Sequence, residues 1–271
     1  MLVDVARRIT PRRLRIRVGE WLDSKLVKSR LLTFVFYYFI YGVVVRVKPM
    51  PDSNCLIASL GTEMIIPRDS VPVFIEIFHD CVYEQFSSPG IGNIVIDAGA
   101  HAGMFTMKAA KLVGDSGLVV AIEPEPSNLA LLQRNIESHS LTNVKVVSEA
   151  ALNEKTTVKL YLQDLSGEHS LSRRSGDYIE VSADSLDNIV SKLGLDRVDF
   201  VKIDVEGAEL ETLKGAEKVL AFPGIKLSIA SYHVLPDGQP QLPGIVSYLE
   251  SRQFRTQIYI KGSAPYVYAE K

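Results

Sequence analysis

The stretch IVIDAGAHAG, residues 94–103, starts as a short apolar strand and then turns at glycines, and a helix is expected directly after it, over 103–113. From here on, short apolar strands alternate with helices, which is typical of a parallel sheet covered by helices on both faces. The last two strands are expected to form an antiparallel hairpin at the sheet edge. The other expected strands are 118–123, 144–148, 157–163, 178–182, 199–203, 225–230, 254–260 and 265–269, and the other helices are 127–140, 186–193, 208–220 and 242–252.

The chain upstream of this pattern is organised differently. A break containing two prolines lies at 48–52, a hairpin is expected from 55–59 and 63–66, and Pro72 is expected to begin a helix. We therefore predict two parts, a helical N-terminal extension over 1–50 and a main domain over 51–271.

Composition excludes several classes of protein. The chain has 271 residues, of which 46% are hydrophobic and 23% charged, so global disorder is excluded. The net charge of −2 implies no general attraction to nucleic acid. Two cysteines cannot supply a disulfide framework or a cysteine-rich zinc site.

The N-terminal extension is basic and then apolar. Residues 1–30 carry nine Lys and Arg against three acidic residues, and the run LLTFVFYYFIYGVVV follows at 31–45. A membrane-spanning helix needs about 20 apolar residues, so this run is short. Three interpretations stay open, namely a packed helix, a helix lying in a membrane interface, and a short tilted span.

Acidic residues follow three of the expected strands, namely Asp97, Glu123 and Asp204. In open α/β sheets, ligands bind beyond the carboxyl ends of the strands. A dinucleotide site would need the pattern G-x-G-x-x-G, but His101 stands two residues after Gly99. Asp97 would also repel a pyrophosphate, whereas a cationic ligand without phosphate, such as S-adenosylmethionine, would be attracted.

Other residues fit a nucleoside site of this kind. Glu123 is expected to accept hydrogen bonds from the ribose hydroxyls. Glu149, or a backbone group beside it such as that of Ala150, is expected to face the adenine ring. Tyr83 is expected to cover the methionine end of the cofactor.

The glycine loop, the stretch IEPEP at 122–126 and the segment DFVKIDVEGAELETLKGAEKVL at 199–220 resemble the FkbM family of S-adenosylmethionine-dependent methyltransferases, over residues 71–270. The resemblance implies a class I methyltransferase (Rossmann-like) α/β fold, with a seven-stranded, mostly parallel sheet and an antiparallel C-terminal edge strand. It makes 51–271 the methyltransferase domain. Members of the family typically carry Asn where His101 stands. The candidate cofactor-binding residues are Asp97, Gly99, Ala100, His101, Gly103, Glu123, Pro124, Asn128, Glu149, Ala150 and Tyr83.

Methyl transfer depends mainly on holding the acceptor close to the methyl group. Asp204 is the main candidate to orient or deprotonate an acceptor, with Glu206 two residues later; a helix-capping role for Asp204 is the alternative. His233 follows another strand and is a candidate general base. Asp204 and His233 alone do not make a metal site, so no metal is expected.

The leading hypothesis is methylation of a hydroxyl on a small molecule or glycan, with no nucleic-acid partner. We expect a cytoplasmic protein whose residues 1–48 make, at most, a peripheral contact with an anionic inner membrane surface. Whether the chain forms a homo-oligomer is left open by the sequence. An NAD-dependent oxidoreductase and a non-catalytic, membrane-associated binding module are the alternatives.

Overall fold

The computed structural model describes residues 45–50, 52–162, 177–235 and 238–271. The chain divides into two compact units, Met1–His79 and Asp80–Lys271, and each is described by itself. Residues 1–44 of the predicted helical extension, with nearly all of its apolar run, lie outside the described residues. The helical prediction is wrong for the end of the extension, where Arg46–Pro49 form a strand. The boundary predicted after residue 50 stays a prediction, although strand β1 (Arg46–Pro49) pairs with strand β2 (Asn54–Ser59) across it.

The first unit contains the predicted hairpin. Strands β2 and β3 (Thr62–Pro67) pair in antiparallel register, and β1 completes a three-stranded sheet. The 3-10 turn η1 (Arg68–Ser70) leads into helix α4 (Val71–Phe78), which has Pro72 in its first turn. The helix does not extend past Cys81, because Cys81 has a positive φ of 50° and cannot continue a right-handed helix.

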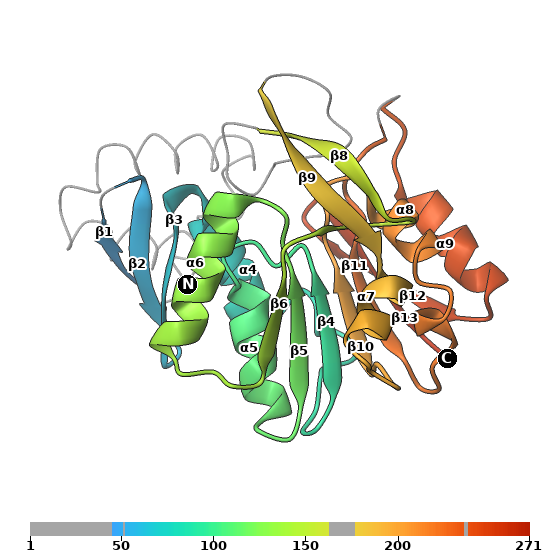
Figure 1. The fold of residues 1–271 in the computed structure, drawn as a ribbon, viewed down its shortest axis with the longest axis horizontal. Helices are drawn as coiled ribbons and strands as arrows, with labels where there is room; N and C mark the ends of the chain where they lie inside the picture. The colour runs from blue at the N-terminus through green and yellow to red at the C-terminus, as the bar shows by residue number, and fades with distance from the viewer. Residues whose placement is uncertain (1–44, 51, 163–176, 236–237) are drawn as a thin grey trace, which may run out of the picture. The chain divides into compact units, whose positions relative to one another are not determined.

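The second unit is built on a seven-stranded sheet, which confirms the predicted fold class (Figure 1). The strand order is β12-β13-β11-β10-β4-β5-β6, with parallel pairing from β11 to β6. In the C-terminal hairpin, β13 lies inside the sheet, antiparallel to both β11 and β12, and β12 forms the edge. The strands are β4 (Ile94–Ala98), β5 (Leu118–Ile122), β6 (Val144–Val147), β10 (Phe200–Ile203), β11 (Lys226–Ala230), β12 (Arg255–Lys261) and β13 (Ala264–Glu270).

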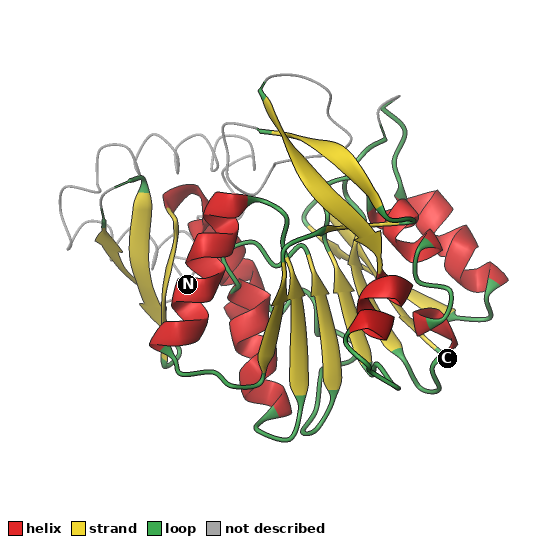
Figure 2. Ribbon diagram, in the orientation of Figure 1, coloured by secondary structure: helices red, strands yellow, loops and turns green. Residues whose placement is uncertain are grey.

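Helices cover both faces of this sheet (Figure 2). On one face, α7 (Leu186–Lys192), α8 (Glu209–Lys214) and α9 (Leu242–Ser251) bury their apolar side chains in the main core cluster. On the other face, α6 (Pro126–Ser138) packs on β5 and β6, and Phe105 of α5 (Met104–Val113) stacks on Phe200. The expectation of a sheet covered on both sides is therefore confirmed.

Two details differ from the sequence-based expectation. The strands β8 (Thr156–Tyr161) and β9 (Tyr178–Ser185) form a separate three-stranded sheet with β7 (Ala150–Leu152), which was not predicted. The helix expected over 208–220 is split into α8 and the turn η2 (Val219–Ala221). The split falls at Gly215, where the backbone passes so close to β7 that a Cβ would lie 2.1 Å from the Leu152 carbonyl oxygen.

The strand order creates the place where a ligand can enter. The chain leaves β4 toward β5 and β6 on one side and later returns to β10 and β11 on the other, so the order reverses beside β4. Ligands of open α/β sheets bind at such a switch point. Gly99 has a φ of 78°, and a Cβ there would lie 1.8 Å from the backbone oxygen of Asp204, so only glycine lets the two loops approach this closely.

In the part of the chain that the structure describes, no helix is both long enough and apolar enough to span a membrane. The membrane contact and the compartment stay predictions.

Candidate functional site

Asp97 is buried in an ion pair at the end of β4. Its side chain is fully buried, and its Oδ1 lies 3.0 Å from Nζ of Lys202. Thr106 Oγ1 of α5 donates to its Oδ2 at 2.6 Å. Asp97 and Lys202 are register partners on neighbouring strands, which explains why their side chains meet. The charge that was expected to attract a cationic ligand is therefore already balanced within the protein.

The glycine loop is tied to the end of β5. The backbone N–H groups of Gly99 and Ala100 both donate to the Ile122 carbonyl oxygen, and the N–H of His101 donates to Glu123 Oε2 at 2.8 Å. Gly99, His101 and Gly103 all have positive φ, so the loop is a chain of tight turns. The loop thus brings together the candidate residues of β4 and β5 as predicted, through its backbone.

Glu123 is a buried carboxylate within reach of this loop. The N–H of Glu125 donates to its Oε1 at 3.0 Å. Burial raises the pKa of Glu123 to about 7, against the lowering effect of the N–H groups of Glu125 and His101. Because this pKa lies above the ordinary value of 4.5, the group lowers the free energy of unfolding as the pH rises from 4.5 to about 7.

The next candidates hold the start of α6 or lie apart. Glu125 caps α6, since its side chain accepts a hydrogen bond from the N–H of Asn128 at 2.6 Å. Pro124, between Glu123 and Glu125 in the sequence, is half-buried. Glu149 is an ion-pair partner of Lys192 on α7, at 3.2 Å, and Ala150 is buried at the start of β7. The structure thus gives Glu149 a partner other than an adenine ring, and its cofactor role stays a prediction.

Tyr83 and Asp204 meet on the other side of the switch point. The Tyr83 hydroxyl donates to Asp204 Oδ2 at 2.6 Å, and its ring packs edge-on against Phe105 and Tyr266. Burial and the neighbouring Asp204 raise the pKa of Tyr83 well above its usual value, so the phenol stays a donor. Tyr83 therefore fixes the orientation of the Asp204 carboxylate.

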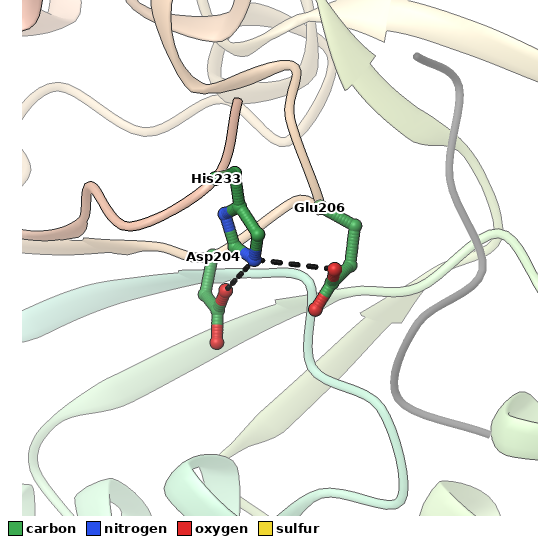
Figure 3. A group of neighbouring side chains, drawn as sticks. All are labelled: Asp204, Glu206 and His233. Atoms are coloured by element: carbon green, nitrogen blue, oxygen red, sulfur yellow. Dashed lines mark ion pairs between the residues drawn. The ribbon is translucent and has the colours of Figure 1, made fainter. Parts of the chain in front are cut away.

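His233 lies between acidic side chains of the segment that follows β10. Its Nε2 is 3.1 Å from Glu206 Oε2 and 3.9 Å from Asp204 Oδ1, and Figure 3 shows this nitrogen facing both carboxylates. Glu206 has a φ of 52°, a strained conformation for a residue other than glycine and one that is common at functional sites. The three predicted catalytic residues are thus brought together.

A fourth residue of the cluster, Glu209, was missed as a site residue. It is fully buried, and its Oε1 lies 2.8 Å from His233 Nδ1 and accepts the N–H groups of Val205 and Gly207. Gln241 donates to its Oε2 at 2.7 Å. Burial lowers the pKa of His233, but the adjacent carboxylates of Glu206 and Glu209 outweigh burial and raise it well above its usual value.

Some of the predicted carboxylates are placed where they could bind a cationic nucleoside. Glu123 offers a carboxylate at the carboxyl edge of β5, while Asp204 and Glu206 give the loop after β10 a negative charge. The fit comes from Glu123 and this loop, because Lys202 neutralises Asp97. Lys202 could have been suspected from the sequence, since a lysine inside an apolar strand needs a buried acidic partner.

Comparison with known proteins was made by sequence and by structure. A family model described as "Methyltransferase FkbM domain" matches residues 97–256. Methyltransferase 1 of Beauveria bassiana is 27% identical over 164 residues, which cover 52% of this chain and 65% of that protein. The 31-O-demethyl-FK506 methyltransferase FkbM of Streptomyces tacrolimicus is 26% identical over 211 residues, which cover 66% of this chain and 79% of that protein.

Among solved structures, the methyltransferase FkbM of Methylobacillus flagellatus KT aligns with a TM-score of 0.53 at 20% identity. The alignment covers 72% of this chain and 47% of that one, and it supports the fold alone. The matched part of this chain therefore spans less than two thirds of both the Beauveria and the Methylobacillus proteins.

Proposed function

Because this chain belongs to the FkbM family of methyltransferases, we propose that it methylates a hydroxyl oxygen of a small molecule or a sugar. As a member of this family it is an S-adenosylmethionine-dependent enzyme. Membership in this family argues against the two alternatives, an NAD-dependent oxidoreductase and a non-catalytic binding module. The relative from Streptomyces is named for methylating an oxygen of a small molecule, which supports the choice of acceptor atom.

The observation that carries the proposal is the convergence of Asp204, Glu206 and His233 at the switch point of the sheet. S-adenosylmethionine supplies, when bound, a methyl group on a positively charged sulfur. We propose that Glu123 binds the ribose and that the backbone of the glycine loop passes around the cofactor. The acidic cluster is proposed to orient the acceptor hydroxyl and to accept its proton, as the new O–C bond forms and the electron pair of the C–S bond stays on sulfur.

The acceptor can be identified directly. We expect that incubating the full chain with methyl-labelled S-adenosylmethionine and a fractionated cell extract labels a compound of low mass. Mass spectrometry then finds this compound heavier by one methylene group, with the label on oxygen. Label on nitrogen or carbon, or on nucleic acid, would contradict the proposed acceptor class while leaving the family assignment in place.

The proposed ribose contact predicts a pH dependence of cofactor binding. Below its pKa of about 7, Glu123 is mostly protonated and must lose its proton before it can accept bonds from both ribose hydroxyls. We expect the affinity for S-adenosylmethionine to rise between about pH 6 and pH 8, by up to about tenfold for each pH unit below the pKa. Calorimetric titration across this range measures it.

The variant Glu123→Gln is the control for this pH dependence, since its side chain does not titrate. It should bind the cofactor more weakly and lose the part of the pH dependence that comes from Glu123. An identical pH profile for the variant and the wild type would show that Glu123 does not contact the ribose.

A further inference from the structure

Asp204, Glu206 and His233 have the arrangement of metal ligands. One ligand atom from each residue lies within 4.8 Å of the others, and Figure 3 shows the carboxylates on the same side as Nε2 of the imidazole. Neighbouring ligands of an octahedral ion bound at about 2.1 Å are about 3 Å apart. The contact of 3.1 Å between His233 Nε2 and Glu206 Oε2 agrees with that spacing.

The residues behind these ligands hold them in the required state. Glu209 accepts a hydrogen bond from His233 Nδ1 at 2.8 Å, so Nδ1 carries a proton and Nε2, which points into the cluster, is the nitrogen available to a cation. Metal-binding histidines usually donate their second nitrogen to a carboxylate in this way. Tyr83 donates to Asp204 Oδ2, which leaves Oδ1 facing His233.

Two atoms in the cluster make no hydrogen bond. Among the residues that the structure describes, His233 Nε2 and Asp204 Oδ1 are both buried without one, although Nε2 lies 3.1 Å from the charged Glu206 Oε2. The His233 side chain is only 9% exposed. Buried polar atoms nearly always have a hydrogen-bond partner, and one without a partner can mark the place where an ion binds.

The charge of the cluster also favours a cation. Asp204, Glu206 and Glu209 surround one imidazole, and the nearby Lys202 is paired with Asp97. Buried carboxylates need compensation by a positive charge. The earlier expectation that no metal binds rested on only two ligands, and Glu206 is the third.

We propose that Asp204, Glu206 and His233 bind a divalent cation of the Mn²⁺ type, which accepts carboxylate oxygens together with an imidazole nitrogen. Three protein ligands leave open positions for water and for the acceptor. This role rests on the proposed function: a hydroxyl bound to the cation gives up its proton to a carboxylate of the cluster more easily and is held as the nucleophile.

Titration of the full chain with Mn²⁺, followed by the EPR signal of the free ion, tests this site without any acceptor. We expect a single tight site in the wild type. The variant Glu209→Gln should weaken it by about 10- to 100-fold, as loss of a supporting hydrogen bond usually does. Glu206→Gln, Asp204→Asn and His233→Gln should weaken it at least as much. The control is Glu211→Gln, which changes an exposed acid on α8, the helix that carries Glu209. This variant should bind Mn²⁺ as the wild type does.

Far-UV circular dichroism identifies variants that fail to fold. Glu206, with a side chain 23% exposed, is the most exposed of the three ligands, so its replacement should disturb packing least. Absence of Mn²⁺ binding by the wild type, or equal binding by a folded Glu206→Gln protein, would overturn the metal site. Calorimetry with S-adenosylmethionine on the same samples separates the two proposals. Cofactor binding without Mn²⁺ binding refutes the metal alone, whereas Mn²⁺ binding without methyl transfer to any hydroxyl refutes the proposed acceptor class alone.

Discussion

Replacing Lys202 by methionine is expected to lower the free energy of unfolding by about 3–5 kcal/mol, because it leaves the buried Asp97 carboxylate without its cation. Lys202 is nearly as buried as Asp97, and its Nζ also donates to the Gly99 carbonyl oxygen at 2.6 Å. Methionine keeps most of the apolar stem but supplies no charge and no donor. Urea unfolding followed by circular dichroism measures the change.

Two further variants test whether the lost stability comes from the unpaired Asp97 carboxylate. Asp97→Asn combined with Lys202→Met removes both charges and should recover part of the lost stability. Lys192→Met removes a half-exposed lysine that pairs with Glu149 and Asp184, and it should cost less than Lys202→Met. If Lys202→Met kept its stability but lost affinity for S-adenosylmethionine, the pair would belong to the cofactor site rather than to the core.

Replacing Asp204 by asparagine is expected to lower kcat by about 100- to 1000-fold, the range typical of a group that handles a proton or orients a nucleophile. The amide oxygen of asparagine can still accept the Tyr83 hydroxyl, so the local structure should remain. The affinity for S-adenosylmethionine should change little, because Glu123 and the glycine loop are the proposed cofactor contacts. Steady-state kinetics with the identified acceptor, together with calorimetry, separates the two effects.

The matched control for Asp204→Asn is Glu211→Gln, an acid that pairs with Lys214 at the surface of α8. It should keep both kcat and cofactor affinity. If Asp204→Asn weakened cofactor binding and left kcat unchanged, Asp204 would have to be reassigned to the cofactor.

The regular elements of the second unit were predicted well. Strands such as β4 and β10 are short, apolar and buried on both faces, so their sequences carry a strong local signal. The three-residue strand β7 was missed, because a segment this short has no pattern of its own and is held by its pairing with β9. The split after α8 was missed for a similar reason, since it depends on the contact between Gly215 and Leu152.

The fold class, the family and the order in which the acids follow the strands could all be predicted from the amino-acid sequence, because they depend on local patterns and a long motif. Which acids act together became visible in the folded chain. Asp97 lies beside Lys202 because β4 and β10 are neighbours in register. His233 meets Glu206 and Glu209 because β11 ends next to the segment after β10. Which charged side chains form ion pairs depends on the distances between them across the sheet, and the order of residues along the chain does not specify those distances.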